Sequence, residues 1–184
     1  MDFYAEYLNE IGIARQKFKD MKLYPAGVIL CDFYALPSHN HQAYYAMVSA
    51  EKNGWNITYV KTKIYSAENP GVPVLMRSFA DCLKAEDEKS FGWNGQFYAG
   101  VKNLPEAYID SLTDIAEMLP DKYISLDSEI CIDGVFQAMR LFKEGTITKE
   151  ILYRKADRIP LQKRTDALIS RLDSLYIEIE NIID

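Results

Sequence analysis

The sequence has few of the residues that most catalytic and metal-binding motifs require. Only two histidines, His39 and His41, and three cysteines, Cys31, Cys82 and Cys131, occur among its 184 residues. The cysteines are odd in number and none forms a CxxC pair, so they predict buried thiols in a reducing compartment and no disulfide framework. The motifs GxGxxG, GxxxxGK[ST] and HExxH are also missing, which leaves the nucleotide-binding and zinc-protease classes without support.

Long hydrophobic runs and an excess of positive charge are missing as well. No apolar run approaches the roughly 18 residues that a membrane span requires, and the N-terminal sequence MDFYAEYLNEIG has no basic region followed by an apolar one. With 27 acidic against 21 basic residues the net charge is −6, so a basic face for nucleic acid is not expected. We therefore predict a cytoplasmic protein that contacts neither membrane nor nucleic acid directly and carries no cofactor.

The composition that remains is that of a folded domain. Apolar residues make up 48% of the chain and charged residues 26%, which argues against disorder. A chain of this length can bury a core without disulfides or metals. We predict one domain over residues 1–184; the alternative is a subdivision near residue 103, into 1–103 (a helix and a meander) and 104–184 (a helix, a meander and a long helix).

Periodic apolar residues predict three helices. The N-terminal helix spans 2–21, with an apolar face made by Tyr4, Leu8, Ile11, Ala14, Phe18 and Met21. A middle helix begins near Pro105, and a long C-terminal helix runs over 161–183. Strands are expected at 27–35 (the central strand), 42–65 (a hairpin), 72–79, 127–133, 135–143 and around 147–153. Tight turns between neighbours predict antiparallel pairing, so the fold class is α+β with an antiparallel meander sheet and three helices.

The hairpin carries the strongest local signal, because Asn53-Gly54 stands between two strand-like runs. If these two residues form the turn, Lys52 lies opposite Trp55, and the register pairs Ala50 with Ile57. Neither face of this hairpin is wholly polar. We therefore expect both faces to be covered over part of their length by the two terminal helices.

The most one-sided stretch is 105–134, which holds eight carboxylates and a single cation, Lys122. Within the predicted middle helix, Tyr108, Leu112, Ile115 and Leu119 make an apolar stripe. The acids follow a second stripe of helical spacing, so they are expected to face water. We name seven of these acids as candidate partner-binding residues: Glu106, Asp110, Asp114, Glu117, Asp121, Asp127 and Glu129. A solvated surface is the more common explanation of such a stripe, because runs of charge are usually solvated faces.

Other candidate sites have weaker support. His39 and His41 form an H-x-H pair that places two imidazoles on one side of an extended chain, but zinc needs a third ligand, such as Asp32 or a cysteine. Cys31 is a candidate nucleophile without a supporting spacing. Five cations near Pro160 predict a solvated helix start: Arg154, Lys155, Arg158, Lys163 and Arg164.

The sequence thus favours a small, non-enzymatic binding protein that engages a basic protein through an acidic face. An inhibitor that covers the basic active site of a nuclease is one physical example of this class. Two alternatives stay open. The chain is a structural or homo-oligomerisation module whose aromatic segment 91–98 pairs with another copy, or it is an enzyme whose site the motifs do not reveal.

Overall fold

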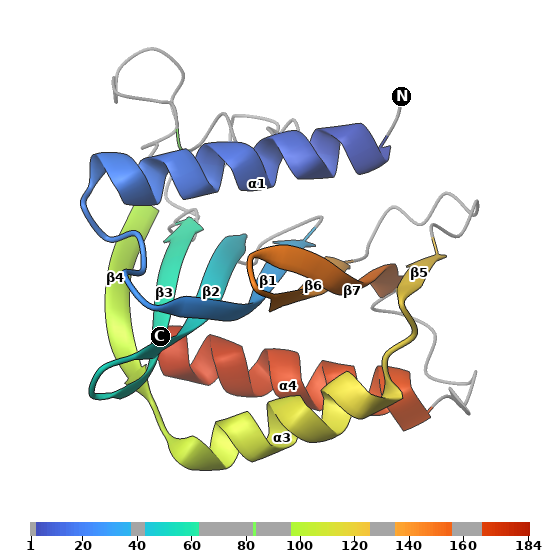
Figure 1. The fold of residues 1–184 in the computed structure, drawn as a ribbon. Coiled ribbons are helices and arrows are strands. Elements are labelled where there is room, and N and C mark those ends of the chain that lie inside the picture. Colours follow the sequence, from blue (N-terminus) through green and yellow to red (C-terminus); the bar gives the residue numbers. More distant parts are fainter. Residues whose placement is uncertain (1–2, 38–42, 63–82, 84–96, 126–134, 156–166) are drawn as a thin grey trace.

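The computed structural model describes residues 3–37, 43–62, 83, 97–125, 135–155 and 167–184 (Figure 1). Its three described helices are α1 (Phe3–Asp20), α3 (Glu106–Met118) and α4 (Ala167–Ile183). Its seven described strands are β1 (Val28–Pro37), β2 (Tyr44–Glu51), β3 (Gly54–Thr62), β4 (Phe97–Leu104), β5 (Lys122–Ser125), β6 (Val135–Lys143) and β7 (Thr146–Lys155). None of these helices is both long enough and apolar enough to span a membrane.

All seven strands form one sheet in the order β4-β3-β2-β1-β6-β7-β5. Every neighbouring pair is antiparallel except β5 and β7, which run parallel at one edge of the sheet. The predicted α+β class and the central position of the first strand are therefore confirmed. Because β1 pairs with β6, strands from both sides of residue 103 belong to the same sheet.

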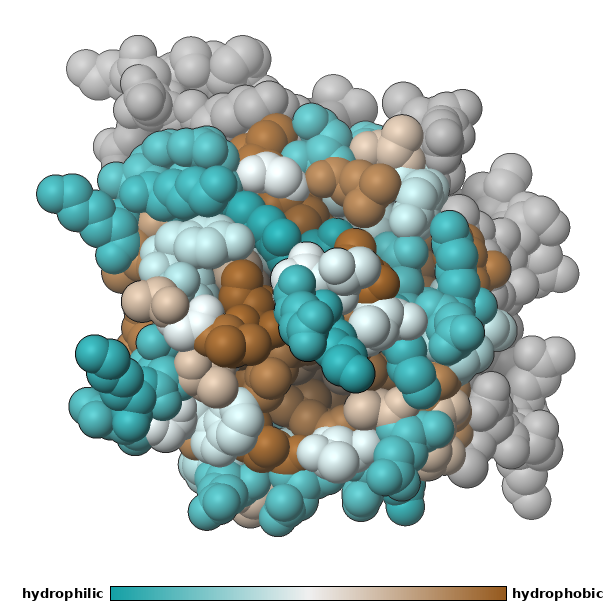
Figure 2. Space-filling view, viewed as in Figure 1, coloured by the Kyte–Doolittle hydropathy of each residue, from teal (hydrophilic) through white to brown (hydrophobic). Residues whose placement is uncertain are grey.

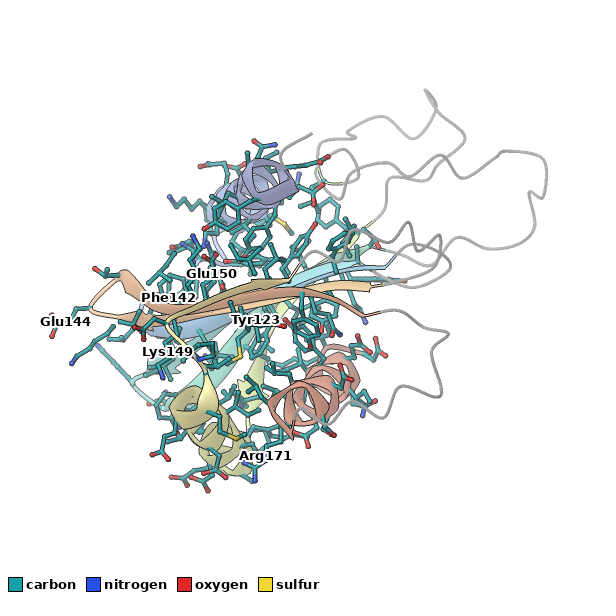
Figure 3. All side chains as sticks on the ribbon, turned by 90° about the vertical axis from the view of Figure 1, so that its right-hand side faces the viewer. Tyr123, Phe142, Glu144, Lys149, Glu150 and Arg171 are labelled. Atoms are coloured by element: carbon teal, nitrogen blue, oxygen red, sulfur yellow. The ribbon has the colours of Figure 1, made fainter. Side chains whose placement is uncertain are left out.

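The helices cover both faces of the sheet (Figures 1 and 3). Helix α1 lies on one face, called here the upper layer, whereas α3 and α4 lie next to each other on the opposite face, called the lower layer. Each layer has its own apolar core. Tyr34 and Met47 pack beneath α1, whereas Phe33 and Val48, their neighbours along the same strands, pack against the lower layer. The alternation of side chains along a strand produces these two cores from one sheet.

The buried face of α1 differs from the predicted stripe. Ile11, Ala14 and Phe18 are buried as expected, but Leu8 is 38% exposed and Met21 is 41% exposed. Tyr7, together with Glu10, takes the place expected of Leu8. The apolar pattern missed this rotation because it does not count a glutamate as buried: Glu10 accepts a hydrogen bond from the hydroxyl of Tyr34, and the ring of Tyr7 packs against the ring of Tyr34.

The predicted hairpin is present as β2 and β3, but its register was wrong by two residues. Glu51 pairs with Gly54 and Ala50 pairs with Trp55, so Lys52 and Asn53 form the turn. Gly54 begins β3 with a φ of 126°, a conformation that residues with a side chain rarely adopt. A shift of two residues leaves each side chain on its predicted face, because the side-chain period of a strand is two.

The apolar pattern predicts some of the remaining strands and misses others. The strands predicted at 135–143 and around 147–153 are confirmed as β6 and β7. The predictions at 72–79 and 127–133, the first residues of the predicted C-terminal helix and most of the aromatic segment lie outside the described residues. Two strands were not predicted, β4 and β5. Both are edge strands, and β5 has only four residues, which is too short to show a period.

A row of alternating charge crosses the upper face of the sheet. The register aligns four residues of four adjacent strands: Asp32, Arg140, Glu150 and Lys122. Opposite charges placed directly across neighbouring strands stabilise their pairing. Helix α1 closes the row from above, because the hydroxyl of Tyr4 donates a 2.8 Å hydrogen bond to Glu150, and the ammonium group of Lys122 lies 4.9 Å from the Tyr4 ring centroid.

Asp32 is the centre of this row and is only 1% exposed. Its carboxylate accepts hydrogen bonds from Arg140 of β6, at 2.9 Å from Nε, from Arg15 of α1, at 3.0 Å, and from the hydroxyl of Tyr45, at 2.6 Å. Burial alone lowers the pKa of Arg140, but its hydrogen bonds with Asp32 and the charge of Asp32 outweigh that effect, so the pKa lies above its ordinary value. The guanidinium groups therefore remain charged inside the protein.

We predict that Asp32→Ala destabilises the protein by roughly 3–5 kcal/mol, because two guanidinium groups lose their buried counter-charge. Urea unfolding followed by circular dichroism measures the change. Asp20→Ala is the matched control, since Asp20 is exposed and bonds only with Gln16 in the same helix, and it is expected to cost less than about 0.5 kcal/mol. Equal stability of the two variants would contradict a structural role for the Asp32 cluster.

A second prediction concerns alkaline pH. Burial raises the pKa of five tyrosines above the ordinary value: Tyr7, Tyr34, Tyr44, Tyr45 and Tyr176. Folding thus favours the protonated phenols, so their contribution to stability is complete below the unfolded pKa of about 10 and is lost as the pH rises above it. We expect cooperative unfolding above about pH 10, in step with tyrosinate absorbance. Tyrosine ionisation without loss of secondary structure would refute this linkage.

Candidate functional site

Helix α3 is positioned by one apolar stripe, as the sequence predicted. Leu112, Ile115 and Leu119 are buried against the lower face of the sheet, and Tyr108 is half-buried beside them. Pro105 precedes the first helical residue, and its carbonyl accepts a 3.0 Å hydrogen bond from the amide of Tyr108. Because the apolar stripe faces the sheet, the opposite side of the helix faces solvent.

The acidic stripe occupies that outer side. Glu106, Asp110, Asp114 and Glu117 are all exposed on α3, and Asp121 is exposed just beyond its end. The spacing of four, four and three residues places the first four on one side of the helix. The candidates Asp127 and Glu129 lie outside the described residues. The structure thus places four of the seven candidate acids along the outer side of α3, whereas Asp121 lies at the edge of the sheet, where its carbonyl accepts a hydrogen bond from the amide of Glu150.

Helix α4 extends this charge across the lower layer. Residues 105–121 and 167–184 together hold nine acidic residues and a single basic one, Arg171. Helix α4 contributes Asp173, Glu178 and Glu180, and Asp184 follows directly after it. By contrast, α1 holds three acidic and three basic residues, so the upper layer is balanced. Among the described residues, most acids of the second half of the sequence therefore lie in or next to the two helices of the lower layer.

Acids near the C-terminal end of a helix are unfavourable, because the unpaired carbonyls there already carry negative potential. Lysines from the sheet offset this. Lys149 of β7 donates to the carbonyls of Ala116 and Leu119 at the end of α3, at 2.8 and 2.7 Å. At the end of α4, Lys102 donates to the carbonyl of Ile182 at 2.7 Å. Figure 3 shows Lys149 reaching from the sheet toward the lower layer, with Glu150 on the opposite side.

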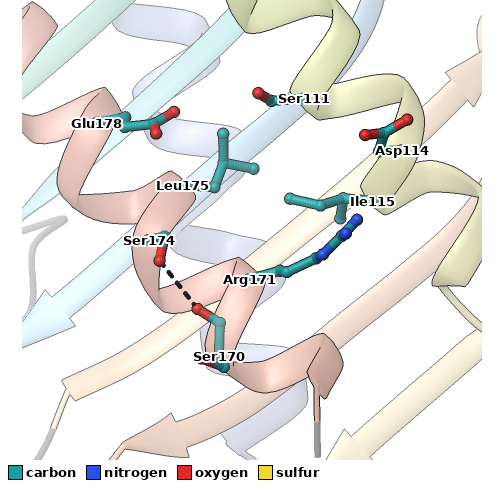
Figure 4. A pocket seen from close by; sticks show the side chains of 8 residues that line it. All are labelled: Ser111, Asp114, Ile115, Ser170, Arg171, Ser174, Leu175 and Glu178. Carbon is teal, nitrogen blue, oxygen red and sulfur yellow. Dashed lines mark hydrogen bonds between the residues drawn. The ribbon is translucent and has the colours of Figure 1, made fainter.

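A groove runs between α3 and α4 (Figure 4). It has a volume of about 220 Å³ and is lined by Ser111, Asp114, Ile115, Ser170, Arg171, Ser174, Leu175 and Glu178. Ile115 and Leu175 are 3% and 2% exposed, so they form its floor. Asp114 belongs both to the acidic stripe and to the groove, so the two features make one continuous surface. The sequence did not reveal the groove, because no local pattern shows which two helices will become neighbours.

The other candidate residues do not form a site within the described structure. His39 and His41 lie outside it, and no group of three or more metal-ligating side chains occurs among the described residues. Asp32, the suggested third zinc ligand, already accepts hydrogen bonds from two arginines and a tyrosine. Cys31 is buried, which raises the pKa of its thiol well above the usual range, so it is not an activated nucleophile. Of the basic cluster near Pro160, only Arg154 and Lys155 fall in a described element, the end of β7.

Apolar side chains are also visible at the surface. Figure 2 shows a patch of hydrophobic colour near the middle of one face, between α1 above and the lower layer below. Val28, at the start of β1, is 60% exposed, and half-buried residues such as Leu30 and Leu141 border the lower core. Some apolar surface is exposed on every folded domain. The acidic surface of the lower layer is therefore the stronger candidate site.

Comparisons with protein-family models, with curated proteins and with solved structures find no significant match to the chain. The function is therefore inferred from the geometry and charge of the lower layer.

The lysine cap of α3 gives a prediction. Lys149→Met keeps the aliphatic stem but removes the donor, leaving the last carbonyls of α3 without their partner, and should destabilise the protein by about 1–3 kcal/mol. Urea unfolding reports the global change, and hydrogen exchange reports the protection of the α3 amides. Lys143→Met is the control, because Lys143 is exposed at the end of β6. Unchanged protection of α3 in Lys149→Met would show that the cap does not hold this helix.

Proposed function

We propose that the chain is a non-enzymatic binding protein that docks a basic protein on the outer surface of its lower layer. The observation that carries this proposal is the concentration of seven acids and one base on α3 and α4, opposite a balanced α1. An acidic surface of this extent attracts a basic partner over about a Debye length, roughly 8 Å at physiological ionic strength. Complementary charge accelerates encounter and rejects acidic competitors.

The arrangement of the lysines supports the proposal. Lys149 and Lys102 point inward and are engaged with helix carbonyls, and Lys61 pairs with Asp184 at 2.6 Å. These three cations thus contact the ends of α3 and α4, and among the described residues no cation forms an ion pair with the outer acids of α3. Like charges one turn apart on an exposed helix cost about 0.2–0.5 kcal/mol per pair. A docking role accounts for an acidic stripe that is mildly unfavourable for the free protein.

The two alternatives have less support in the described residues. For self-association, Tyr98 and Val101 are exposed on the edge strand β4, at 49% and 45%. They are three residues apart, however, so in a regular strand they point to opposite faces and do not form one apolar patch. For an enzyme, Asp32 is held in an internal ion cluster and Cys31 is a buried thiol.

The proposal is tested by binding of a fluorescent nona-lysine peptide, followed by anisotropy at increasing salt. The variant Asp110→Lys/Asp114→Lys/Glu117→Lys should lose at least about tenfold in affinity, and wild-type affinity should fall steeply with ionic strength. The control Glu6→Lys/Asp20→Lys/Glu144→Lys changes the net charge by the same amount, using residues of α1 and of the β6–β7 turn. It should lose about threefold or less, because the altered charges lie away from the docking surface.

Equal losses in the two triple variants would mean that the peptide senses only the net charge, and the proposed docking surface would be rejected. A salt-independent affinity would reject it as well. Circular dichroism of both variants confirms that a loss of binding is not a loss of folding.

A further inference from the structure

We infer that the groove between α3 and α4 receives one arginine side chain of the basic partner, which takes the place that Arg171 occupies in the free protein. This inference deepens the proposed function and rests on it. Three properties of the groove carry it: an apolar floor, walls that offer hydrogen-bond acceptors, and a guanidinium group that already lies between the two helices.

The floor and the walls match the two parts of an arginine side chain. Ile115 and Leu175 provide buried apolar surface for the methylene stem, and Asp114 and Glu178 stand on opposite helices to meet the charged end. Long basic side chains commonly lie along apolar surface with their charged end among polar groups. The groove is thus amphipathic in the same sense as its proposed occupant.

The serines of the groove add to its acceptor character. The hydroxyl of Ser174 donates to the carbonyl of Ser170 at 3.1 Å, and that of Ser111 donates to the carbonyl of Ala107 at 3.4 Å. A hydroxyl has one proton, so both oxygens offer only lone pairs to a ligand. Carboxylates and hydroxyls of this kind favour a ligand that donates hydrogen bonds and accepts none. Guanidinium carries five N–H groups and accepts nothing, which suits this groove better than a neutral polar group.

Arg171 shows that a guanidinium fits. Figure 4 shows its side chain extending from α4 across the groove toward α3, in the direction of Asp114 and Ile115. It is exposed and is the single cation in the helical segments of the lower layer. Among the described residues no ion pair holds Arg171 in this position, so an incoming arginine can displace it at low cost. Arg171 is thus an internal competitor for the partner's arginine.

The experiment measures the affinity of the full chain for fluorescent nona-arginine and nona-lysine peptides at about 0.15 M and 0.5 M salt. At the higher salt concentration long-range attraction is weakened, but contact pairs persist. Arg171→Gln removes the competitor and should tighten nona-arginine about fivefold at the higher salt. Lys22→Gln removes the same charge from an exposed residue beyond α1, and should change the affinity less than about twofold.

A second pair of variants tests the wall. Asp114→Asn should weaken nona-arginine about fivefold at the higher salt, whereas Asp110→Asn, on the same stripe but outside the groove, should weaken it about twofold or less. A smaller effect on nona-lysine in the same assay indicates recognition of guanidinium. Equal effects on the two peptides would overturn the assignment to arginine.

The outcomes separate this inference from the proposed function. One outcome is that Arg171→Gln has the same affinity for nona-arginine as Lys22→Gln, and Asp114→Asn the same as Asp110→Asn, while the α3 triple variant still loses affinity. In that case the groove is not a subsite and the acidic docking surface stands. If the triple variant also binds as well as wild type, both are overturned. Circular dichroism on each single variant confirms that the fold is intact.

Discussion

The carboxylate of Asp32 is the contact on which the upper half of the structure depends. It lies in the middle of the central strand and accepts hydrogen bonds from the strand beside it, from the next strand on its other side, and from α1 above. A buried ion cluster adds little net stability compared with an apolar core, but removing one member leaves uncompensated charge. Because Arg15 must reach Asp32, α1 has one favourable rotation and one favourable position along the sheet. The rotation that exposes Leu8 and buries Glu10 is consistent with this requirement.

The lower layer is attached to the sheet by different contacts from those of the upper layer. Apolar side chains attach α3 and α4 to the sheet, while Lys149 and Lys102 bond the final carbonyls of the two helices from within. Cations placed at helix C-termini are favourable wherever they come from. Supplying them from strands instead of from the helices leaves the outer surfaces of α3 and α4 free of lysine. The acidic surface is therefore compatible with two stable helices.

The sequence predicts the parts of this fold that depend on local pattern. The three helices, the central strand and the buried stripe of α3 follow from periodicity, as does the outward position of Asp110 and Asp114. The predicted hairpin register was wrong because the turn is Lys52-Asn53 instead of Asn53-Gly54. Moving the turn by one residue shifts the strand pairing by two, and only the pairing of the whole strands decides between these turns. The ion cluster was missed because Asp32 and Arg140 are 108 residues apart, and a single buried acid in a strand has no local signature. The groove was missed for the same reason, since its walls come from helices separated in sequence by three strands.

Only the fold shows that two separate groups of acids lie on the same face of the sheet. In sequence, the acids of 105–121 and those of 173–184 are two separate groups, and each alone is consistent with a solvated surface. The sheet places both helices on one face, where their fields add, and places the charge-balanced α1 on the other. Coulomb energy between exposed charges falls off within about a Debye length, so summed charge acts on a partner only when it is gathered in space. Under the proposed function, a face that combines the acids of α3 and α4 with an acceptor-lined groove selects a partner more narrowly than net charge does, because the partner has to match both the charge and the position of one arginine.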